Sequence, residues 1–419
     1  MKFTDVDDSK DKTNKFYGIN SSMWKNFYSG NFFHSSPTNI KIIENGYFLP
    51  LKDSSIVNHL LGGIVDSEGK YICGHLRHTV NIDYPPECSN SYPFDKKAVK
   101  TSHETVIYGG LVFPHFGFML IESLSRLWYV INNSSILEKH KIVFLGKYNK
   151  LFVNDFLKLI GISSDKVLFL TEVTKFDKII IPEQSGFTLQ YAHNEYLIPY
   201  DKMVFNSQLN KNLIKHPKIY LSKSNYKINS SHNTFNSGYR IIGEEYFENF
   251  YSKNGYNILH TSNLTMEEKV FYISNADEIV TTSGTMSHYF LFAKKNCRVV
   301  TLVRNNDERM YAQALINSIK HLNFYMIDCS LNFLYSESYG GCSLLYPTQA
   351  WRDYVKDNFK NVEIEPYDSE YILEYIKYFY QFYKCKRKFD FSKEIFINDF
   401  FKRCGQLFFN EDFSPNEQS

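Results

Sequence analysis

Residues 109–128 read GGLVFPHFGFMLIESLSRLW, and this stretch decides both the fold and the chemistry expected of the chain. A strand that ends at the glycine pair leads into a predicted helix from about residue 115 to residue 131. At roughly 100° per residue, Glu122 and Arg126 lie within about 20° of His115 around that helix. The side chains on most of the remaining helix surface are apolar, so we expect a largely buried helix that keeps one polar stripe. Buried charges are costly unless they are paired or used, and the stripe is therefore a candidate for catalysis.

Two interpretations of this stripe stay open from the residues alone. In the first, His115 or Glu122 supplies a base or an acceptor-binding edge that faces a cleft. In the second, Glu122 and Arg126, which are spaced i,i+4, form a buried ion pair that fixes the packing of the helix. His115 would then only cap the start of the helix.

Short strands and one helix surround this stretch in the first half of the chain. IENGYFLPL, GGIVDSEGKYI and TVIYGGLVF are predicted strands that are separated by glycine turns. After the long helix, HKIVFLGKY is a buried strand, NDFLKLIGI is a short helix, and KVLFL and FDKIIIP are again strands. This alternation of strand and helix predicts a parallel sheet that is covered by helices.

The same alternation recurs after a helical crossover at residues 193–217. The predicted order is a strand at KIYLSKS, a helix at IGEEYFENFYSKNGY, a strand at YNILH, a helix at MEEKVFYISNA, a strand at DEIVTTSG, a helix at TMSHYFLFAKKN and a strand at RVVTLV. We therefore predict two α/β halves that bind substrates in the cleft between them. The expected boundaries are a loosely held polar segment at 1–31, a first domain at 32–205, a second at 206–346 and a helical extension at 347–419.

Length and composition agree with two globular domains. The chain has 419 residues, which exceeds the size at which one core keeps growing, and 43% of them are hydrophobic. A net charge of +2 argues against a dedicated nucleic-acid-binding protein. The seven cysteines are scattered without a C-x-x-C pair, which is typical of reduced thiols. The polar start does not resemble a signal peptide, and no uncharged run reaches the roughly 18 residues of a membrane span, so we expect a cytoplasmic protein.

A second candidate site lies at TTSGTMSHYF, residues 281–290. There an apolar strand runs through small hydroxyl residues and Gly284 into a predicted helix, an arrangement that suits a phosphate. Ser283, Thr285 and Ser287 offer hydroxyl groups to it. The alternative is an ordinary strand–helix turn, because serine and threonine are also common helix N-caps. The turn is neither a P-loop nor the G-x-G-x-x-G of a dinucleotide fold.

Two cations and two carboxylates complete the candidates in the second half. Lys223 follows a strand and Arg240 precedes a helix, so both could meet a diphosphate. Glu244 and Glu268 are candidates for binding a ribose or a base. The alternative for all four is a solvated surface position.

Three further groups of residues favour structural or surface roles. The spacing of Cys73, His75, His78 and Cys88 fits no common zinc finger, so it does not predict a metal site. Asp5 and Asp7 lie in the polar start and are poor candidates for holding a metal–nucleotide complex. The basic cluster at residues 384–388 could touch an anionic membrane surface, but a solvated helix end is favoured.

Taken together, these blocks resemble the glycosyltransferase 61 family. The first block resembles the family's H-[FY]-G-H-[FW]-L-x-[ED] helix and the arginine that follows it, with matches at His115, Phe116, Gly117, Glu122, Arg126 and Leu127, and with Phe118 in place of the second histidine. KIYLSKS resembles a strand that usually ends in arginine, here Lys223. The later blocks match at Arg240, Glu244, Glu268, Gly284, Thr285 and His288, with Gly243 and Tyr289 where the family usually has asparagine. The resemblance covers roughly residues 62–303.

This resemblance implies two Rossmann-like domains of the GT-B type and an inverting transfer of sugar from a nucleotide-sugar, most simply a UDP-sugar, to a glycan hydroxyl. His115 or Glu122 would be catalytic, and Gly117, Arg126 and His193 would bind the acceptor. The nucleotide-sugar would contact Lys223, Arg240, Glu244, Glu268, Ser283, Gly284, Thr285, Met286, Ser287 and His288, without a required metal. The expected process is synthesis of a bacterial capsule or another surface polysaccharide, with peripheral contact with the membrane or with assembly proteins. The alternatives are a sugar-nucleotide epimerase of the same fold and a non-catalytic scaffold of a polysaccharide assembly complex.

Overall fold

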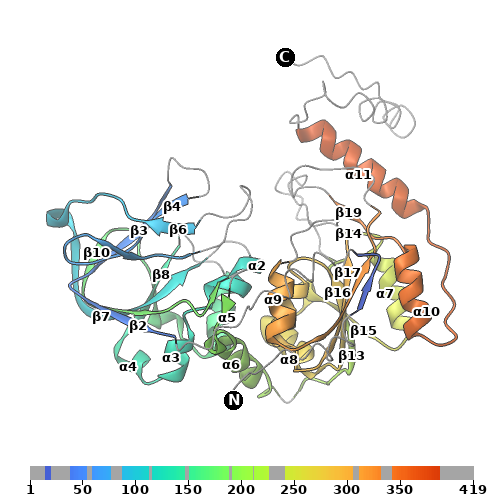
Figure 1. The fold of residues 1–419 in the computed structure, drawn as a ribbon, viewed down its shortest axis with the longest axis horizontal. Coiled ribbons are helices and arrows are strands. Elements are labelled where there is room, and N and C mark those ends of the chain that lie inside the picture. The colour runs from blue at the N-terminus through green and yellow to red at the C-terminus, as the bar shows by residue number, and fades with distance from the viewer. Residues whose placement is uncertain are drawn as a thin grey trace, which may run out of the picture.

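The computed structural model describes residues 15–19, 38–53, 59–76, 87–112, 116–146, 151–187, 191–210, 212–225, 241–304, 311–331 and 342–386. These residues form two large sheets, one in each half of the chain, with helices around and between them (Figure 1). The mixed α/β class predicted from the sequence is confirmed. Within these ranges, no helix combines the length and the apolar character that crossing a bilayer requires.

The sheet of the first half has nine strands and is mixed rather than purely parallel. One side of it, out to the edge strand β9, is the parallel set β10-β7-β8-β9, formed by Thr174–Pro182, Lys100–Leu111, Lys141–Leu145 and Val167–Phe169. The strands predicted at IENGYFLPL and GGIVDSEGKYI extend it as β2 (Ile40–Glu44), β3 (Tyr47–Asp53), β4 (His59–Val65) and β5 (Tyr71–Cys73), whereas β6 (Glu87–Asn90) was not predicted. β2 and β3 both pair antiparallel with β10, so the expected parallel sheet carries an antiparallel addition.

The helix predicted from residue 115 to residue 131 is interrupted. The structure has a short α2 (Phe116–Phe118), a π-helical turn η3 (Met119–Ser123), turns, and then α3 (Trp128–Asn132). The physical reason is that two tyrosine hydroxyls compete with the backbone N–H groups of the helix for its carbonyl oxygens. The Tyr196 hydroxyl donates to the carbonyl of Ile121 at 2.6 Å, and the Tyr200 hydroxyl donates to that of Leu120 at 2.5 Å. The 100° spacing that aligned the polar stripe therefore does not hold beyond α2.

Two other helical segments of the first half follow the sequence prediction. They are α5 (Leu151–Ile160) and the crossover, which consists of the 3-10 turn η5 (Asn194–Leu197) and α6 (Ile198–Ser207). The short helix α4 (Ile136–Lys139) was not predicted. A small ladder of β11 (Gly186–Phe187) and β12 (Tyr191–Ala192) precedes the crossover. Helix α6 packs against α5 of the first half and against α8 (Met266–Asn275) of the second half. The crossover therefore joins the two halves by packing as well as by chain connection.

The sheet of the second half is entirely parallel, in the order β1-β18-β17-β16-β13-β15. Its strands are β13 (Lys218–Ser222), β15 (Asn257–His260), β16 (Glu278–Thr282), β17 (Arg298–Val303) and β18 (Asn323–Asp328), with β1 (Lys15–Tyr17) at one edge. Leaving β1 aside, the spatial order of these strands is 2-1-3-4-5 in chain order, which is a doubly wound arrangement. Its helices are α7 (Glu244–Lys253), α8, the 3-10 turn η8 (Ser287–Phe292), α9 (Tyr311–Ile319) and α10 (Gln349–Asn358).

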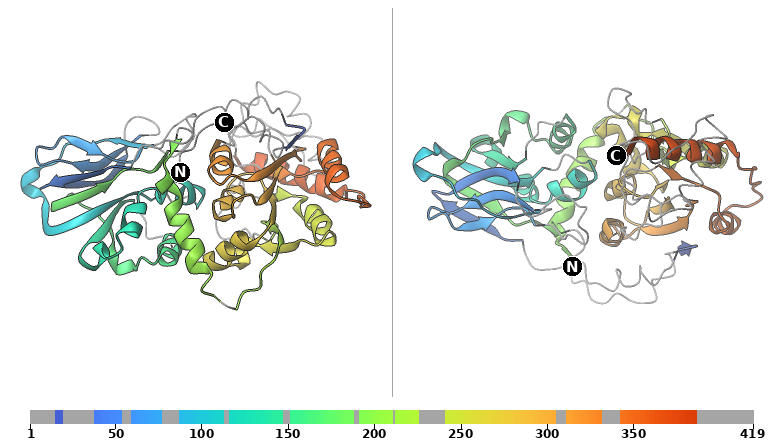
Figure 2. Two further views of the ribbon diagram at one scale, coloured as in Figure 1. Left: turned by 60° about the horizontal axis from the view of Figure 1, so that its bottom comes forward. Right: turned by 90° about the horizontal axis from the view of Figure 1, so that it is seen from above.

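The start of the chain belongs to the second sheet, which the sequence did not predict. Residues 15–17 were expected in a loosely held segment, but they form β1, which pairs in parallel with β18 (Figure 2, the dark blue strand beside the orange elements). The Tyr17 hydroxyl also donates to Asp357 Oδ2 at 2.9 Å, next to the end of α10. Strand β1 therefore lies against α10 at one edge of the second sheet.

Helix α10 is part of the core of the second half. Trp351 is fully buried there, and its ring lies 4.7 Å from that of Phe250 and 5.3 Å from that of Phe247, both on α7. Tyr367, in the segment between α10 and α11 (Glu370–Lys386), packs against the same cluster. This part of the predicted extension therefore shares the core of the sheet.

We expect Trp351→Ala to lower the free energy of unfolding by about 3–5 kcal/mol, because it empties a large, fully enclosed site. Trp351→Phe should cost much less, because it keeps most of the ring contacts. Within the described residues, Trp351 Nε1 has no hydrogen-bond partner that phenylalanine would abandon. Urea unfolding followed by fluorescence or circular dichroism measures both variants, and equal losses would contradict the packing argument.

One apolar cluster continues from the first half into the second. It includes Met119 and Leu120 of the π-helical turn together with Phe290 and Leu291 of η8. At its margin the ring of Phe116 lies 5.6 Å from the ring of Tyr289. The beginning of the first sequence motif thus packs against the end of the second.

Candidate active site

The carboxyl edge of the second sheet gathers polar residues at the point where the strand order reverses. Strand β13 lies between β15 and β16, so the switch point lies between the ends of β13 and β16. In open α/β sheets, ligands bind in the crevice outside such a point. β13 leads into Lys223 there, β16 leads into Ser283 and Gly284, and the neighbouring β17 leads into Arg304.

Arg304 lies directly over the turn at Gly284. Its Nε donates to the carbonyl of Ser283 at 3.0 Å, and its backbone N–H donates to the Ser283 hydroxyl at 3.1 Å. Gly284 has a φ of +101°, and a Cβ added to it would lie 3.1 Å from Arg304 Nη2. Glycine is therefore required both by the backbone conformation and by the guanidinium above it. Arg304 was not predicted as a site residue, although Arg304 follows the end of a strand just as Lys223 does.

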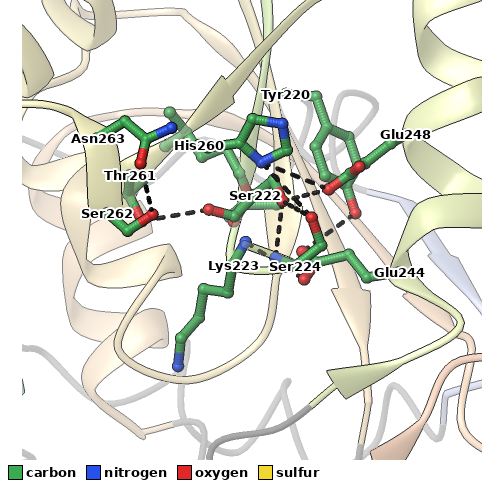
Figure 3. A network of polar contacts seen from close by, with 12 residues as sticks. Tyr220, Ser222, Lys223, Ser224, Glu244, Glu248, His260, Thr261, Ser262 and Asn263 are labelled. Carbon is green, nitrogen blue, oxygen red and sulfur yellow. Dashed lines mark hydrogen bonds and ion pairs between the residues drawn. The ribbon is translucent and has the colours of Figure 1, made fainter. Parts of the chain in front are cut away.

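Lys223 extends from the end of β13 toward the same region. Burial, and then the nearby positive charge of Arg304, lower the pKa of its ammonium group to about 8, although Glu244 acts in the opposite direction. Figure 3 shows the Lys223 side chain directed away from the hydrogen-bonded network behind the strand end. Two cations thus lie near each other at the switch point.

The network behind Lys223 holds the end of β13 in place (Figure 3). Glu244, at the start of α7, is fully buried and its Oε2 accepts a hydrogen bond from the Lys223 backbone N–H at 3.2 Å. Burial, and then the charge of Glu248, raise the pKa of Glu244 to about 8. The Ser222 hydroxyl donates to Glu248, and His260 Nδ1 lies 3.9 Å from the same carboxylate. Glu244 was predicted to bind the nucleotide, but its burial gives it the position of a support for the strand end.

The remaining candidates of the second motif surround the Gly284 turn. Thr285 and Met286 lie in the turn, and the Thr261 hydroxyl is 3.8 Å from the Met286 sulfur. The Ser287 hydroxyl donates to the carbonyl of Gly284 at 2.8 Å, which holds the turn closed. Ser287 and His288 begin η8, a 3-10 helix of six residues where an α-helix was expected. A short 3-10 turn has a weak dipole, so the cations rather than the helix carry the positive charge of this site.

Two other candidates of the second half lie outside this group. Glu268 forms a capping box with Thr265, because its Oε2 accepts from the Thr265 backbone N–H at 2.7 Å and from its hydroxyl at 2.8 Å. That carboxylate stabilises the start of α8. Arg240 lies outside the described residues.

The polar residues of the first motif have different partners from those predicted. Glu122 is buried and its Oε2 lies 3.7 Å from Nε2 of His75, which is also buried. Arg126 donates to the backbone carbonyls of Pro182 and Gly74 and lies 5.1 Å from the centre of the Tyr108 ring. The first catalytic candidate, His115, lies outside the described residues, immediately before Phe116.

The two acceptor candidates near these residues are enclosed. Gly117 is buried in α2. His193 is also buried, its backbone N–H donates to the carbonyl of Ser185 at 2.7 Å, and its ring lies 5.0 Å from that of Tyr191.

His75 and Cys88, two of the four residues weighed as zinc ligands, lie close together because their backbones pair. The N–H of His75 donates to the carbonyl of Cys88 at 2.8 Å, and the reverse bond is 2.9 Å. In the part of the chain that the structure describes, no three side chains of histidine, cysteine, aspartate or glutamate are grouped as a metal site would require. His78, Asp5 and Asp7 lie outside that part, as do the side chains of residues 384–388.

Residues 115–300 match the family model described as Glycosyltransferase 61. Over these residues the chain is glycosyltransferase 61-like. The glycosyltransferase 61-like region begins at His115, within the first sequence motif, contains the second motif and ends within β17. The predicted resemblance is thereby confirmed, and the match supports a glycosyltransferase.

Two further comparisons add to this. No curated protein sequence matches the chain. Among solved structures, the chain is similar to the crystal structure of the bacterial iron-containing dodecameric glycosyltransferase TibC from enterotoxigenic E. coli H10407. The identity is 12%, the similarity covers 65% of this chain and 80% of that chain, and the TM-score is 0.24. A likeness at this level does not define how the two halves of the chain are arranged.

Proposed function

We propose that the protein is an inverting glycosyltransferase that moves a sugar from a nucleotide-sugar, most simply a UDP-sugar, to a hydroxyl of a glycan acceptor. The observation that carries the proposal is the pair of cations, Lys223 and Arg304, at the switch point beside Gly284. Two positive charges held close together disfavour each other unless an anion lies between them. A diphosphate supplies that anion, and the glycine leaves room for it beside the backbone.

The transfer is a single displacement at the anomeric carbon. The acceptor oxygen forms the new bond to this carbon, and the bond from the carbon to the phosphate oxygen breaks. The nucleoside diphosphate leaves with the electron pair, and Lys223 and Arg304 stabilise its growing charge. The hydroxyl proton passes to a base on the first half.

His115 is the base in this proposal, and Glu122 is a positioning residue. Glu122 is buried beside His75, so it lies in a poor position to reach an acceptor hydroxyl. His115 immediately precedes Phe116, whose ring contacts Tyr289 of the second half. His115 is also the first residue of the matched region, residues 115–300. The two cations neutralise the charge of the diphosphate, which a divalent metal does in other transferases. The product of the transfer belongs to the synthesis of a capsule or another surface polysaccharide.

A thermal-shift panel of UDP, GDP, CMP and dTDP tests this function directly. A ligand that binds only the folded state stabilises it by about 2.7 kcal/mol when its concentration is about a hundred times Kd. We expect UDP to raise the melting temperature most, with and without EDTA. If no nucleotide raises the melting temperature, the proposed function is wrong. Isomerisation of a UDP-sugar in the absence of acceptor would instead identify an epimerase.

The affinity for UDP should fall as the pH rises through about 8. Below that pH, Lys223 is charged and Glu244 is neutral, whereas above it Lys223 loses its charge and Glu244 gains one. Both changes make the site less positive, so Kd should rise about tenfold between about pH 7 and about pH 9. Titration calorimetry at several pH values measures this. Lys223→Gln should reduce the dependence to the part that Glu244 contributes, and an undiminished dependence in this variant would exclude Lys223 as a source.

A further inference from the structure

A hollow lies on the first half, lined by none of the switch-point residues. Its volume is about 300 Å³, the size of a small binding site. Its lining comes from β2, from β5 and the residues after it, from the end of β10 and from β12, and it includes Ile40, Cys73, Leu76, Arg126, Gln184 and Tyr191. Strand β12 contacts helix α9 of the second half, so the hollow lies beside the junction of the two halves.

The inner end of this pocket is polar and buried. Arg126 and Gln184 are only 6% and 5% exposed. The Gln184 amide donates to the carbonyls of Leu76 and Gly186 at 3.1 and 3.0 Å, which fixes its orientation. Among the described residues, Gln184 Oε1 and Arg126 Nε have no hydrogen-bond partner. The Gln184 carbonyl oxygen can accept a hydrogen bond from a sugar hydroxyl, and the Arg126 guanidinium can donate one. The neighbouring Tyr191 ring can pack against the face of the sugar.

The mouth of the pocket is mixed, because the exposed Asn39 and Lys41 line it together with two apolar side chains. Ile40 and Leu76 line it, yet they are 45% and 52% exposed. Ile42 is 54% exposed and lies two residues further along β2, on the same face of the strand as Ile40. These are three of the six large apolar side chains that are exposed in the described part of the chain. Three such residues beside one polar pocket form an apolar rim that a ligand could cover.

We propose that this pocket binds one sugar residue of the acceptor and that the acceptor carries an alkyl aglycone, which covers the rim formed by Ile40, Ile42 and Leu76. The proposal rests on the proposed glycosyltransferase function and names the class of its acceptor, a lipid-type glycoside. The sugar is bound by Gln184, Arg126 and Tyr191, which set its orientation. The alkyl chain supplies affinity by removing the rim from water.

Saturation-transfer NMR with the full-length protein tests this. The probes are matched methyl and octyl β-glycosides of glucose, galactose and N-acetylglucosamine, with the octyl compounds kept below their micelle concentrations. We expect at least one octyl glycoside to bind about tenfold more tightly than its methyl partner. In Ile40→Ser/Leu76→Ser the two should bind within about twofold of each other. Gln184→Ala should weaken both to a similar extent, because it acts on the sugar.

Leu209→Ser/Ile214→Ser is the matched control, because these side chains are 68% and 73% exposed and lie outside the pocket lining. The control should keep the preference for the octyl compound. Equal loss in the control would mean non-specific adsorption of detergent, and absence of a preference in the wild type would also overturn the proposal. The UDP-induced thermal shift is measured on the same samples. If that shift is present while the octyl preference is absent, only this inference fails, and if both are absent, the function fails as well.

Discussion

The variant Lys223→Ala/Arg304→Ala is expected to bind UDP about a thousandfold more weakly than the wild type. Each cation would donate charge-assisted hydrogen bonds to the diphosphate, and such bonds contribute about 1.5–3 kcal/mol each. Each single variant should therefore lose roughly 10- to 100-fold. Because the two cations share one ligand, their losses need not add, and the double variant measures the coupling between them. Titration calorimetry with UDP gives all three values.

The single variant Lys223→Ala should fold at least as well as the wild type without ligand. The lowered pKa of Lys223 means that its charged form is disfavoured in the folded protein, so removing the charge relieves that cost. An unchanged or higher melting temperature together with lost UDP binding would separate a binding role from a structural one. Lys218→Ala is the matched control, because this exposed lysine starts the strand that leads into Lys223. If the double variant binds UDP like the wild type, the diphosphate site lies elsewhere.

The elements of the second sheet could be predicted from sequence because their signals are local. The apolar stretches KIYLS, EIVTT and RVVTLV form β13, β16 and β17, and the Thr265 capping box marks the start of α8. Strand order is also largely implied, because each strand is followed by a helix and parallel connections are right-handed. The switch point, and with it the location of Lys223 and Gly284, follows from that alternation.

Features that depend on distant residues could not be predicted. Strand β1 contains only Lys15–Tyr17, and nothing in these three residues specifies β18 as their partner. The π-helical turn follows from hydroxyl groups at positions 196 and 200, far along the chain from the carbonyls that they bind. The contact between Glu122 and His75 likewise depends on how β5 and α2 pack. Non-local contacts of this kind have no periodic signal in the sequence.

Arg304 is a different case, because a signal existed. It stands immediately after an apolar strand, as Lys223 does, and parallel strands end at one edge of their sheet. Applying the strand-end argument to every strand of the second half would have placed both cations together. The sequence also could not predict that Glu244 is buried, because burial at the start of α7 is set by the packing of the whole half.

His115→Ala is expected to reduce kcat by about 100- to 10,000-fold while leaving UDP binding unchanged. Loss of a base raises the barrier for proton transfer from the acceptor hydroxyl, but it removes no contact with the diphosphate. The measurement is turnover of a UDP-sugar with an acceptor, paired with the UDP-induced thermal shift of the same preparation. His103→Ala is the control, because His103 is an exposed histidine on β7 of the same half, paired with Asp177.

The pH dependence of kcat/KM distinguishes a base from a structural histidine. If His115 accepts the proton, the wild-type rate should rise with a limb near the ordinary histidine pKa of about 6.5, and the limb should disappear in His115→Ala. Glu122→Gln should lower the rate but keep the limb, because Glu122 lies beside His75 in the interior and acts by positioning. If His115→Ala keeps the limb and more than about a tenth of the wild-type kcat, the base is another residue. A limb lost only in Glu122→Gln would move the role to the buried carboxylate and its histidine partner.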